Sequence, residues 1–168
     1  MDIAALLIEL FDRIPPLADH AVEGLSVEQL VTPPGPGANT VAWLVWHLAR
    51  GQDSQVSDLL DQPQLWEGGD WASRFGLAPD PSNTGYGHHP DEVADVRPDG
   101  PEALTGYLAA VAARTRTYLE GLSADDLDRI VDSRFDPPVT LGVRLVSIAD
   151  DDLQHAGQAA YARGLLLA

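Results

Sequence analysis

The chain contains no cysteine, and this absence removes several classes of protein at once. Without thiol groups, a disulfide framework, a thiolate nucleophile and a thiolate metal site are all excluded. Any metal ligand that this chain supplies must therefore be His, Asp or Glu.

Long apolar runs are also missing. No stretch approaches the roughly 18 uninterrupted apolar residues of a membrane span. The first ten residues contain Asp2 and Glu9, whereas a signal peptide would begin with basic residues followed by an apolar run. We therefore expect a cytoplasmic protein without membrane contact.

Basic residues are scarce, since 10 Lys and Arg residues stand against 26 Asp and Glu residues, a formal net charge of -16. Such a surface repels phosphate backbones and anionic headgroups. We expect no nucleic-acid partner, and we interpret most of the acidic residues as a solvated coat. The charge identifies no partner by itself.

The residues that are present predict a folded domain. The chain has 168 residues, 45% of them hydrophobic and 7% aromatic. This length and composition are sufficient for one domain with a sizeable core. We therefore expect residues 1–168 to form a single domain.

Helical spacing of apolar residues predicts two long helices in the first part of the chain. The first covers about residues 2–24 and is either kinked or restarted at Pro15 and Pro16, because proline removes a backbone donor. The second covers about residues 41–60, with Asn39 or Thr40 as its N-cap.

Two further long helices follow. The third opens with Asp99 as N-cap and closes at Gly121, and the fourth runs from about Thr140 to Arg163, where Gly164 can end it. A short helix between them is predicted from Ser123, with a capping box, through Ile130. With no strand pattern of note, the sequence predicts an all-α four-helix bundle.

A long connection separates the second and third helices, from residue 61 to residue 100. It is rich in Gly, Pro, Asp and Asn but holds four aromatic residues, which are Trp66, Trp71, Phe75 and Tyr86. Disordered segments are usually poor in aromatics. We expect an ordered excursion over one end of the bundle, with a short helix at residues 71–75. A lid over a site is an equally good interpretation.

One stripe of the fourth helix suggests a metal site. Residues three and four apart share a helix face, and this stripe comprises Leu141, Arg144, Ile148, Asp151, His155, Ala159 and Ala162. Because the stripe is mostly apolar, it is expected to face the core and to bury Asp151 and His155 one turn apart. A buried charge costs stability unless it is paired or metal-bound.

A third ligand must come from another helix, and His47 is the candidate because it lies in the most apolar stretch of the second helix. Asp152 competes with Asp151 as the acidic ligand, since it lies three residues before His155. Imidazole and carboxylate ligands suit a divalent metal, with zinc as first choice and nickel as second. The alternative is an ordinary core histidine and a chance spacing.

The segments Trp43–Leu48 and Asp150–Gln158 resemble the DinB-like superfamily, in particular its mycothiol-dependent maleylpyruvate isomerase-like branch. The likeness covers nearly the whole chain. It implies a four-helix bundle, often dimeric, with His47, Asp151 and His155 as metal ligands. The isomerase-like relatives usually have Glu, and other branches His, where this chain has Asp151.

The resemblance implies a thiol S-transferase or isomerase that uses mycothiol as cosubstrate and acts on a small electrophile. A non-catalytic metal-binding or sensing bundle and a metal-dependent hydrolase are the alternatives. Arg144 is a candidate for binding a cofactor or substrate carboxylate, or else forms a structural ion pair. His88 and His89 in the long connection are candidates for an additional ligand or a proton shuttle.

Overall fold

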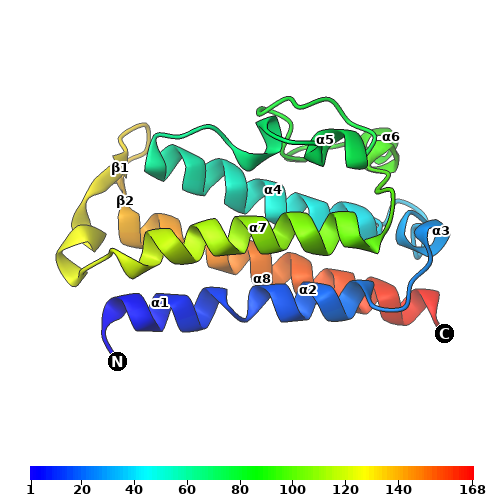
Figure 1. Cartoon of the computed structure of the whole chain (residues 1–168), viewed down its shortest axis with the longest axis horizontal. Coiled ribbons are helices and arrows are strands. Elements are labelled where there is room, and N and C mark those ends of the chain that lie inside the picture. The colour runs from blue at the N-terminus through cyan, green and yellow to red at the C-terminus, as the bar shows by residue number, and fades with distance from the viewer.

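Four helical rods lie side by side in the structure, a computed structural model that describes residues 1–168 (Figure 1). The elements in chain order are α1 (Ile3–Phe11), α2 (Ile14–Val22), α3 (Val27–Leu30), α4 (Val41–Leu60), η1 (Leu65–Glu67), α5 (Trp71–Arg74), α6 (Pro90–Asp95), α7 (Pro101–Glu120), η2 (Ala124–Asp128), β1 (Ile130–Asp132), β2 (Val139–Thr140) and α8 (Leu141–Leu166). The prediction of an all-α four-helix bundle is confirmed.

The first rod consists of α1 and α2, which are separated by Asp12 and Arg13. Pro15 and Pro16 lie in the first turn of α2, where backbone N–H groups have no partner within the helix, so proline costs little there. Of the two predicted arrangements, the restart of the helix is the one that forms.

The ends of the other helices agree only in part with the caps predicted from the sequence. Thr40 caps α4, because its hydroxyl accepts a hydrogen bond from the Trp43 N–H at 3.0 Å. The prediction of Asp99 as N-cap of α7 is wrong, since Gly100 occupies that position and Asp99 binds the side chain of Arg74. Helix α8 also continues past Gly164 to Leu166. A glycine within a helix costs only about 1 kcal/mol relative to alanine, so it does not have to end the helix.

The direction of the rods explains the long connection. In Figure 1, α4 and α7 run the same way, while the first rod and α8 run the opposite way. Two neighbouring helices that run in parallel need a connection as long as the bundle, and residues 61–100 provide it. Helices α4 and α8 are therefore antiparallel neighbours, and the candidate site lies between them.

A small hairpin joins α7 to α8. The predicted capping box is present, with the Ser123 N–H donating to the Asp126 carboxylate at 2.8 Å, but the helix it opens is a short 3-10 turn. The prediction of a helix through Ile130 is wrong, because this residue begins strand β1, which pairs antiparallel with β2. The expectation of no strand missed this hairpin, whose strands of three and two residues are too short to show alternation.

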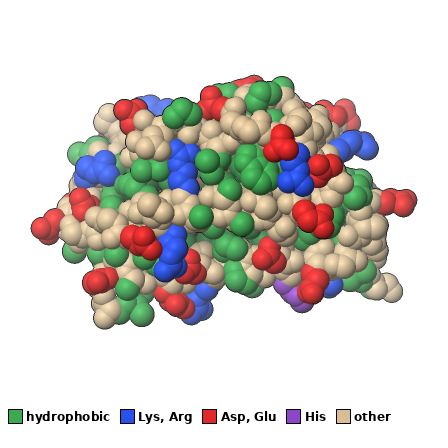
Figure 2. Space-filling model, viewed as in Figure 1, with side chains coloured by type: hydrophobic (Ala, Val, Ile, Leu, Met, Phe, Trp, Pro, Cys, Tyr) green, Lys and Arg blue, Asp and Glu red, His purple; other side chains and the backbone are tan.

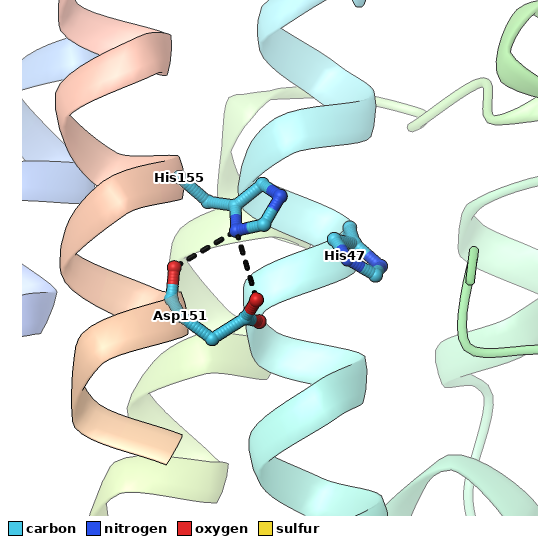
Figure 3. Close-up of side chains that lie close together, drawn as sticks. All are labelled: His47, Asp151 and His155. Atoms are coloured by element: carbon cyan, nitrogen blue, oxygen red, sulfur yellow. Dashed lines mark hydrogen bonds and ion pairs between the residues drawn. The ribbon is translucent and has the colours of Figure 1, made fainter. Parts of the chain in front are cut away.

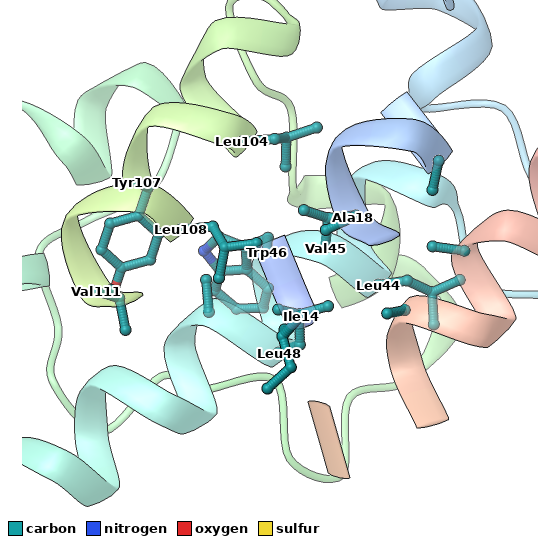
Figure 4. Close-up of a cluster of buried hydrophobic side chains, with 14 of the residues drawn as sticks. Ile14, Ala18, Leu44, Val45, Trp46, Leu48, Leu104, Tyr107, Leu108 and Val111 are labelled. Atoms are coloured by element: carbon teal, nitrogen blue, oxygen red, sulfur yellow. The ribbon is translucent and has the colours of Figure 1, made fainter. Parts of the chain in front are cut away.

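One cluster of 35 buried apolar residues fills the space between the rods, and Figure 4 shows the part of it around Trp46. Trp66 and Phe75 of the long connection pack against Tyr107 of α7, with ring centroids 5.5 and 6.1 Å away. The connection is therefore ordered and packed onto the bundle. Tyr86 is the exception among its aromatic residues, because it is 93% exposed.

The surface visible in Figure 2 carries acidic side chains scattered between arginines and apolar groups, without one large acidic patch. None of the helices combines the length and the apolar character that crossing a bilayer requires.

Candidate metal centre

Two adjacent turns of α4 and α8 face each other at the candidate site. On α4 these turns carry His47 and Gly51, and on the antiparallel α8 they carry His155 and Asp151. A methyl group added to Gly51 would lie 3.7 Å from Oδ2 of Asp151, so this carboxylate rests on the α4 backbone.

The structure brings the three predicted ligands together (Figure 3). One ligand atom from each of His47, Asp151 and His155 lies within 4.8 Å of the others. Ligands about 2.1 Å from a tetrahedral zinc ion lie about 3.4 Å apart, so side-chain rotations that close the widest pair by up to about 1.4 Å would bring the three ligands around one ion. This donor set of two imidazoles and one carboxylate fits a divalent metal ion.

Both histidines use Nδ1 for a hydrogen bond to a backbone carbonyl. In His47, Nδ1 lies 2.6 Å from the carbonyl oxygen of Thr84, and in His155 it lies 2.8 Å from that of Asp151. A carbonyl oxygen only accepts, so Nδ1 carries the proton in each ring and the lone pair is on Nε2. Metal-binding histidines generally have this arrangement, in which a carbonyl or carboxylate fixes the ring and its tautomer.

Burial differs among the three side chains. His47 is 9% exposed, and desolvation lowers the pKa of its imidazole, so that the neutral form required for metal binding prevails at neutral pH. The His155 side chain is 15% exposed and that of Asp151 is 44% exposed. The cluster is therefore closed toward the core and open to solvent on the side of Asp151.

Trp43 and His88 form one wall of the site. The Trp43 indole stacks on the His47 ring with a centroid distance of 4.6 Å and an interplanar angle of 16°. Its N–H donates to Nδ1 of His88 at 3.1 Å, and His88 Nε2 in turn donates to the Asn83 side-chain oxygen at 2.9 Å. Both nitrogens of His88 are thus occupied within the chain, so this histidine positions the connection in this structure.

His89 lies outside the cluster. It is exposed and precedes α6, where its backbone N–H donates to the Glu92 carboxylate at 2.8 Å. The structure gives it no contact with the candidate metal ligands.

Arg50, which sequence reasoning missed, anchors the connection above His47. Its buried guanidinium donates to the backbone carbonyls of Pro81 at 3.2 Å and Asn83 at 3.1 Å. The next residue, Thr84, supplies the carbonyl that binds His47. Arg50 therefore holds the backbone next to Thr84, and Thr84 in turn orients His47, which lies one turn before Arg50 on α4.

Asp53 completes this buried network. Its carboxylate lies 3.5 Å from the Arg50 guanidinium and accepts hydrogen bonds from the Tyr107 hydroxyl at 2.7 Å and from the backbone N–H groups of Leu65 at 3.0 Å and Trp66 at 2.9 Å. Burial raises the pKa of the Tyr107 hydroxyl, which keeps it a neutral donor. The Asp53 carboxylate, paired with Arg50, thus links the start of the long connection to α4 and α7.

The expected burial of the α8 stripe needs a correction. Four residues of the stripe are buried as expected, namely Leu141, Ile148, Ala159 and Ala162, but Asp151 is not. The buried face is wider than the stripe and also includes Leu145, Asp152 and Ala156, because α8 packs against both α2 and α4. Asp152 is 1% exposed, has no hydrogen-bond partner for its carboxyl group, and has a pKa raised well above its usual range by burial and by the charge of Asp151. The cluster contains Asp151 and not Asp152.

Arg144 lies two turns before Asp151 on α8 and binds Asp132. One of its terminal nitrogens donates to the Asp132 carboxylate at 3.2 Å. The structural ion pair, one of the two roles that the sequence predicts for Arg144, is therefore present.

The fold and the cluster together define a helical bundle in which side chains of two facing helices could hold a metal ion. The family model described as the DinB superfamily matches residues 10–159, and the chain belongs to this superfamily. A crystal structure of the conserved protein of a locus from Enterococcus faecalis is similar, with a TM-score of 0.91 and 36% sequence identity over 99% of this chain and 98% of that chain. No curated protein matches.

Proposed function

We propose that the chain binds a divalent metal ion, zinc in preference to nickel, through His47, Asp151 and His155. The observation that carries the proposal is the pair of histidines whose Nδ1 atoms are fixed by backbone carbonyls within one cluster. This leaves two Nε2 lone pairs and one carboxylate as the donor set. Superfamily membership supports the same assignment, because the resemblance to DinB-like proteins implies metal ligands at these three positions.

Three protein ligands leave coordination space for a further molecule, as catalytic zinc sites do. A metal ion in such a site lowers the pKa of a thiol or of water toward about 7 and thereby supplies a nucleophile at neutral pH. Because the chain has no cysteine, a thiol must come from a small cosubstrate, and the maleylpyruvate isomerase-like branch implies mycothiol. We therefore propose a thiol S-transferase or isomerase.

The chain's own residues would divide the work in the following way. Trp43 and His88 exclude water from one side of His47, while the open side at Asp151 admits the thiol and a small electrophile. The thiol proton leaves to solvent past the Asp151 carboxylate as a C–S bond forms at the β-carbon of an α,β-unsaturated acid, whose C=C π bond breaks and sends its electron pair to the conjugated carbonyl. A transferase releases the adduct after a proton from solvent reaches the α-carbon. In an isomerase the adduct rotates about the new single bond, the C–S bond then breaks, the double bond re-forms and the released thiolate takes up a proton.

The metal site is tested by elemental analysis of the protein purified without an affinity tag. We expect a near-stoichiometric divalent metal in the parent protein and its loss in His47→Ala and His155→Ala, each with retained helicity. His89→Ala is the matched control, because this exposed histidine lies outside the cluster and its removal should leave the metal content unchanged. A parent protein that binds no zinc or nickel after loading would contradict the proposal.

The activity is tested with an α,β-unsaturated acid, with and without mycothiol or N-acetylcysteine. A transferase or isomerase converts the acid only when both thiol and metal are present. A metal-dependent hydrolase instead cleaves ester substrates at a rate that added thiol does not change. A protein that binds metal but shows neither activity is the metal-binding or sensing bundle.

A further inference from the structure

Outside the metal centre, one surface pocket gathers three of the chain's ten basic residues, all of which are arginines. We call it the arginine pocket. Its volume is about 310 Å³, and it is lined by Asp58, Leu59, Arg129, Ile130, Val131, Asp132, Arg134 and Arg144. Three guanidinium groups meet two carboxylates there, which leaves a net positive charge in a chain whose total is -16.

Asp132 organises the arginines of this pocket. Its nearly buried carboxylate accepts two hydrogen bonds from Arg134, at 3.0 and 2.8 Å, and one from Arg144 at 3.2 Å. These contacts hold the pKa of the Asp132 carboxyl well below its usual range. Asp132 thus stays ionised and fixes both guanidinium groups in place before any ligand arrives, which reduces the entropy that binding would cost.

Arg144 retains hydrogen-bonding capacity. A guanidinium has five N–H donors in a planar fork that matches a carboxylate. Arg144 uses only one terminal nitrogen, on Asp132, and its side chain is 17% exposed. Its remaining nitrogens are free to bind a second anion, in a partly desolvated position where charge-assisted hydrogen bonds are strong.

The rest of the lining indicates which anion fits. Most of the exposed lining is polar, and Leu59, Ile130 and Val131 contribute a smaller apolar part beside the arginines. A fully hydrated inorganic anion gains nothing from such surface, whereas an organic acid gains from burying its carbon atoms. We propose that the arginine pocket binds the carboxylate of a small organic acid with a short apolar body, and that Arg144 is its anchor.

The pocket lies on the same seam between α4 and α8 as the metal centre. Arg144 precedes Asp151 by seven residues on α8, which is close to two full turns and about 10 Å along the helix. Asp58 follows His47 by eleven residues on α4, on the same side of that helix, about 16 Å away. A short acid bound at Arg144 therefore does not reach the metal centre. If the proposed function holds, only an acid whose carboxylate lies about 10 Å or more from its reacting carbon spans both sites.

Binding is tested on metal-free protein, by following backbone amide resonances in ¹H–¹⁵N spectra during titration with hexanoate. We expect saturable binding in the millimolar range, with shifts at residues 129–134 and 144. Hexanamide is the matched probe, because it has nearly the same shape but no charge. It should produce no saturable shift at these residues.

Two variants locate the binding site. Arg144→Gln should weaken hexanoate binding at least tenfold, since a charge-assisted hydrogen bond contributes about 1.5–3 kcal/mol. Arg74→Gln removes an arginine that binds Asp99 elsewhere and should change nothing. If Arg144→Gln unfolds, Arg129→Gln takes its place, because Arg129 does not bind Asp132. Equal binding of hexanoate and hexanamide, or unchanged hexanoate binding in the folded variant, would overturn the proposal.

The link to the metal centre is tested separately with linear dicarboxylates of graded length. Those long enough to reach from Arg144 to the cluster should bind more tightly to zinc-loaded than to metal-free protein, and short ones should not. Equal affinities for both forms would separate the pocket from the metal centre. Failure of the metal proposal is recognised independently, because the hexanoate titration needs no metal.

Discussion

Gly85 offers the most direct test of how the long connection controls the candidate metal centre. Its backbone lies above His47 with φ +91°, and a Cβ there would come 2.7 Å from His47 Nδ1, 2.9 Å from Trp46 and 3.2 Å from Trp43. We therefore expect Gly85→Ala to damage both the stability of the fold and the affinity for metal.

The expected loss has two parts. An alanine at positive φ costs about 1–2 kcal/mol. Overpacking against three rings adds about 1–3 kcal/mol, because the neighbouring atoms must move by more than a few tenths of an ångström. A total of about 2–5 kcal/mol lowers the melting temperature of a chain of this size by roughly 4–20 °C. Displacing the Thr84 carbonyl from His47 should also weaken metal binding by about 10–100-fold.

Gly87→Ala is the matched control, because Gly87 also has a positive φ, +77°, but a Cβ there has no atom within 4 Å. It should show only the backbone cost of about 1–2 kcal/mol and unchanged metal affinity. The measurements are urea unfolding of the metal-free proteins and competitive zinc titration with a chromophoric chelator. Equal effects of the two substitutions on both quantities would refute the reasoning.

Further predictions concern buried charges. Asp53→Asn should destabilise the fold by about 3–5 kcal/mol in urea unfolding, because it leaves the buried Arg50 guanidinium without its counter-ion. The control Arg74→Gln removes a partly exposed ion pair and should cost no more than about 1 kcal/mol. Similar losses in the two variants would contradict this role for Asp53. In metal-free protein, Asp152→Asn should be progressively more stable than the parent as the pH rises from 4 to 8. Because the folded state raises the pKa of Asp152, the protonated carboxyl group favours folding, and this contribution is complete below the unfolded-state pKa of about 3.9. Above that pH the free energy of unfolding of the parent falls by up to about 1.4 kcal/mol per pH unit, until the pH exceeds the folded-state pKa. A stability difference that does not vary with pH would show that Asp152 keeps the same pKa on unfolding.

Much of the fold can be predicted from the sequence because its signals are local. Apolar spacing predicts α4 over about residues 41–60, as observed, with Thr40 as one of two candidate N-caps. The prolines at positions 15 and 16 predict either a kink or a restart of the first rod, and the restart is observed. The hairpin of β1 and β2 could not be predicted in this way, because each strand is only a few residues long.

The candidate site was only partly predictable for a physical reason. His47 and His155 stand out because imidazoles interrupt apolar helix faces, but the helical wheel alone does not show where α2 and α4 press on α8. The sequence therefore could not show that Asp152 enters the core and Asp151 remains at its edge. Arg50 and Asp53 did leave a signal, since they are opposite charges three residues apart in a largely apolar helix.

The antiparallel pairing of α4 with α8 has a consequence for folding. His47 lies more than a hundred positions before Asp151 and His155, so no local segment contains the whole site. Any partly folded form in which α8 has separated from α4 lacks it altogether. A metal ion that binds only the native state stabilises that state by about 2.7 kcal/mol at a hundred times its dissociation constant. In such a protein, metal occupancy would report the completion of the fold, and a chelator would reveal how stable the bundle is without the ion.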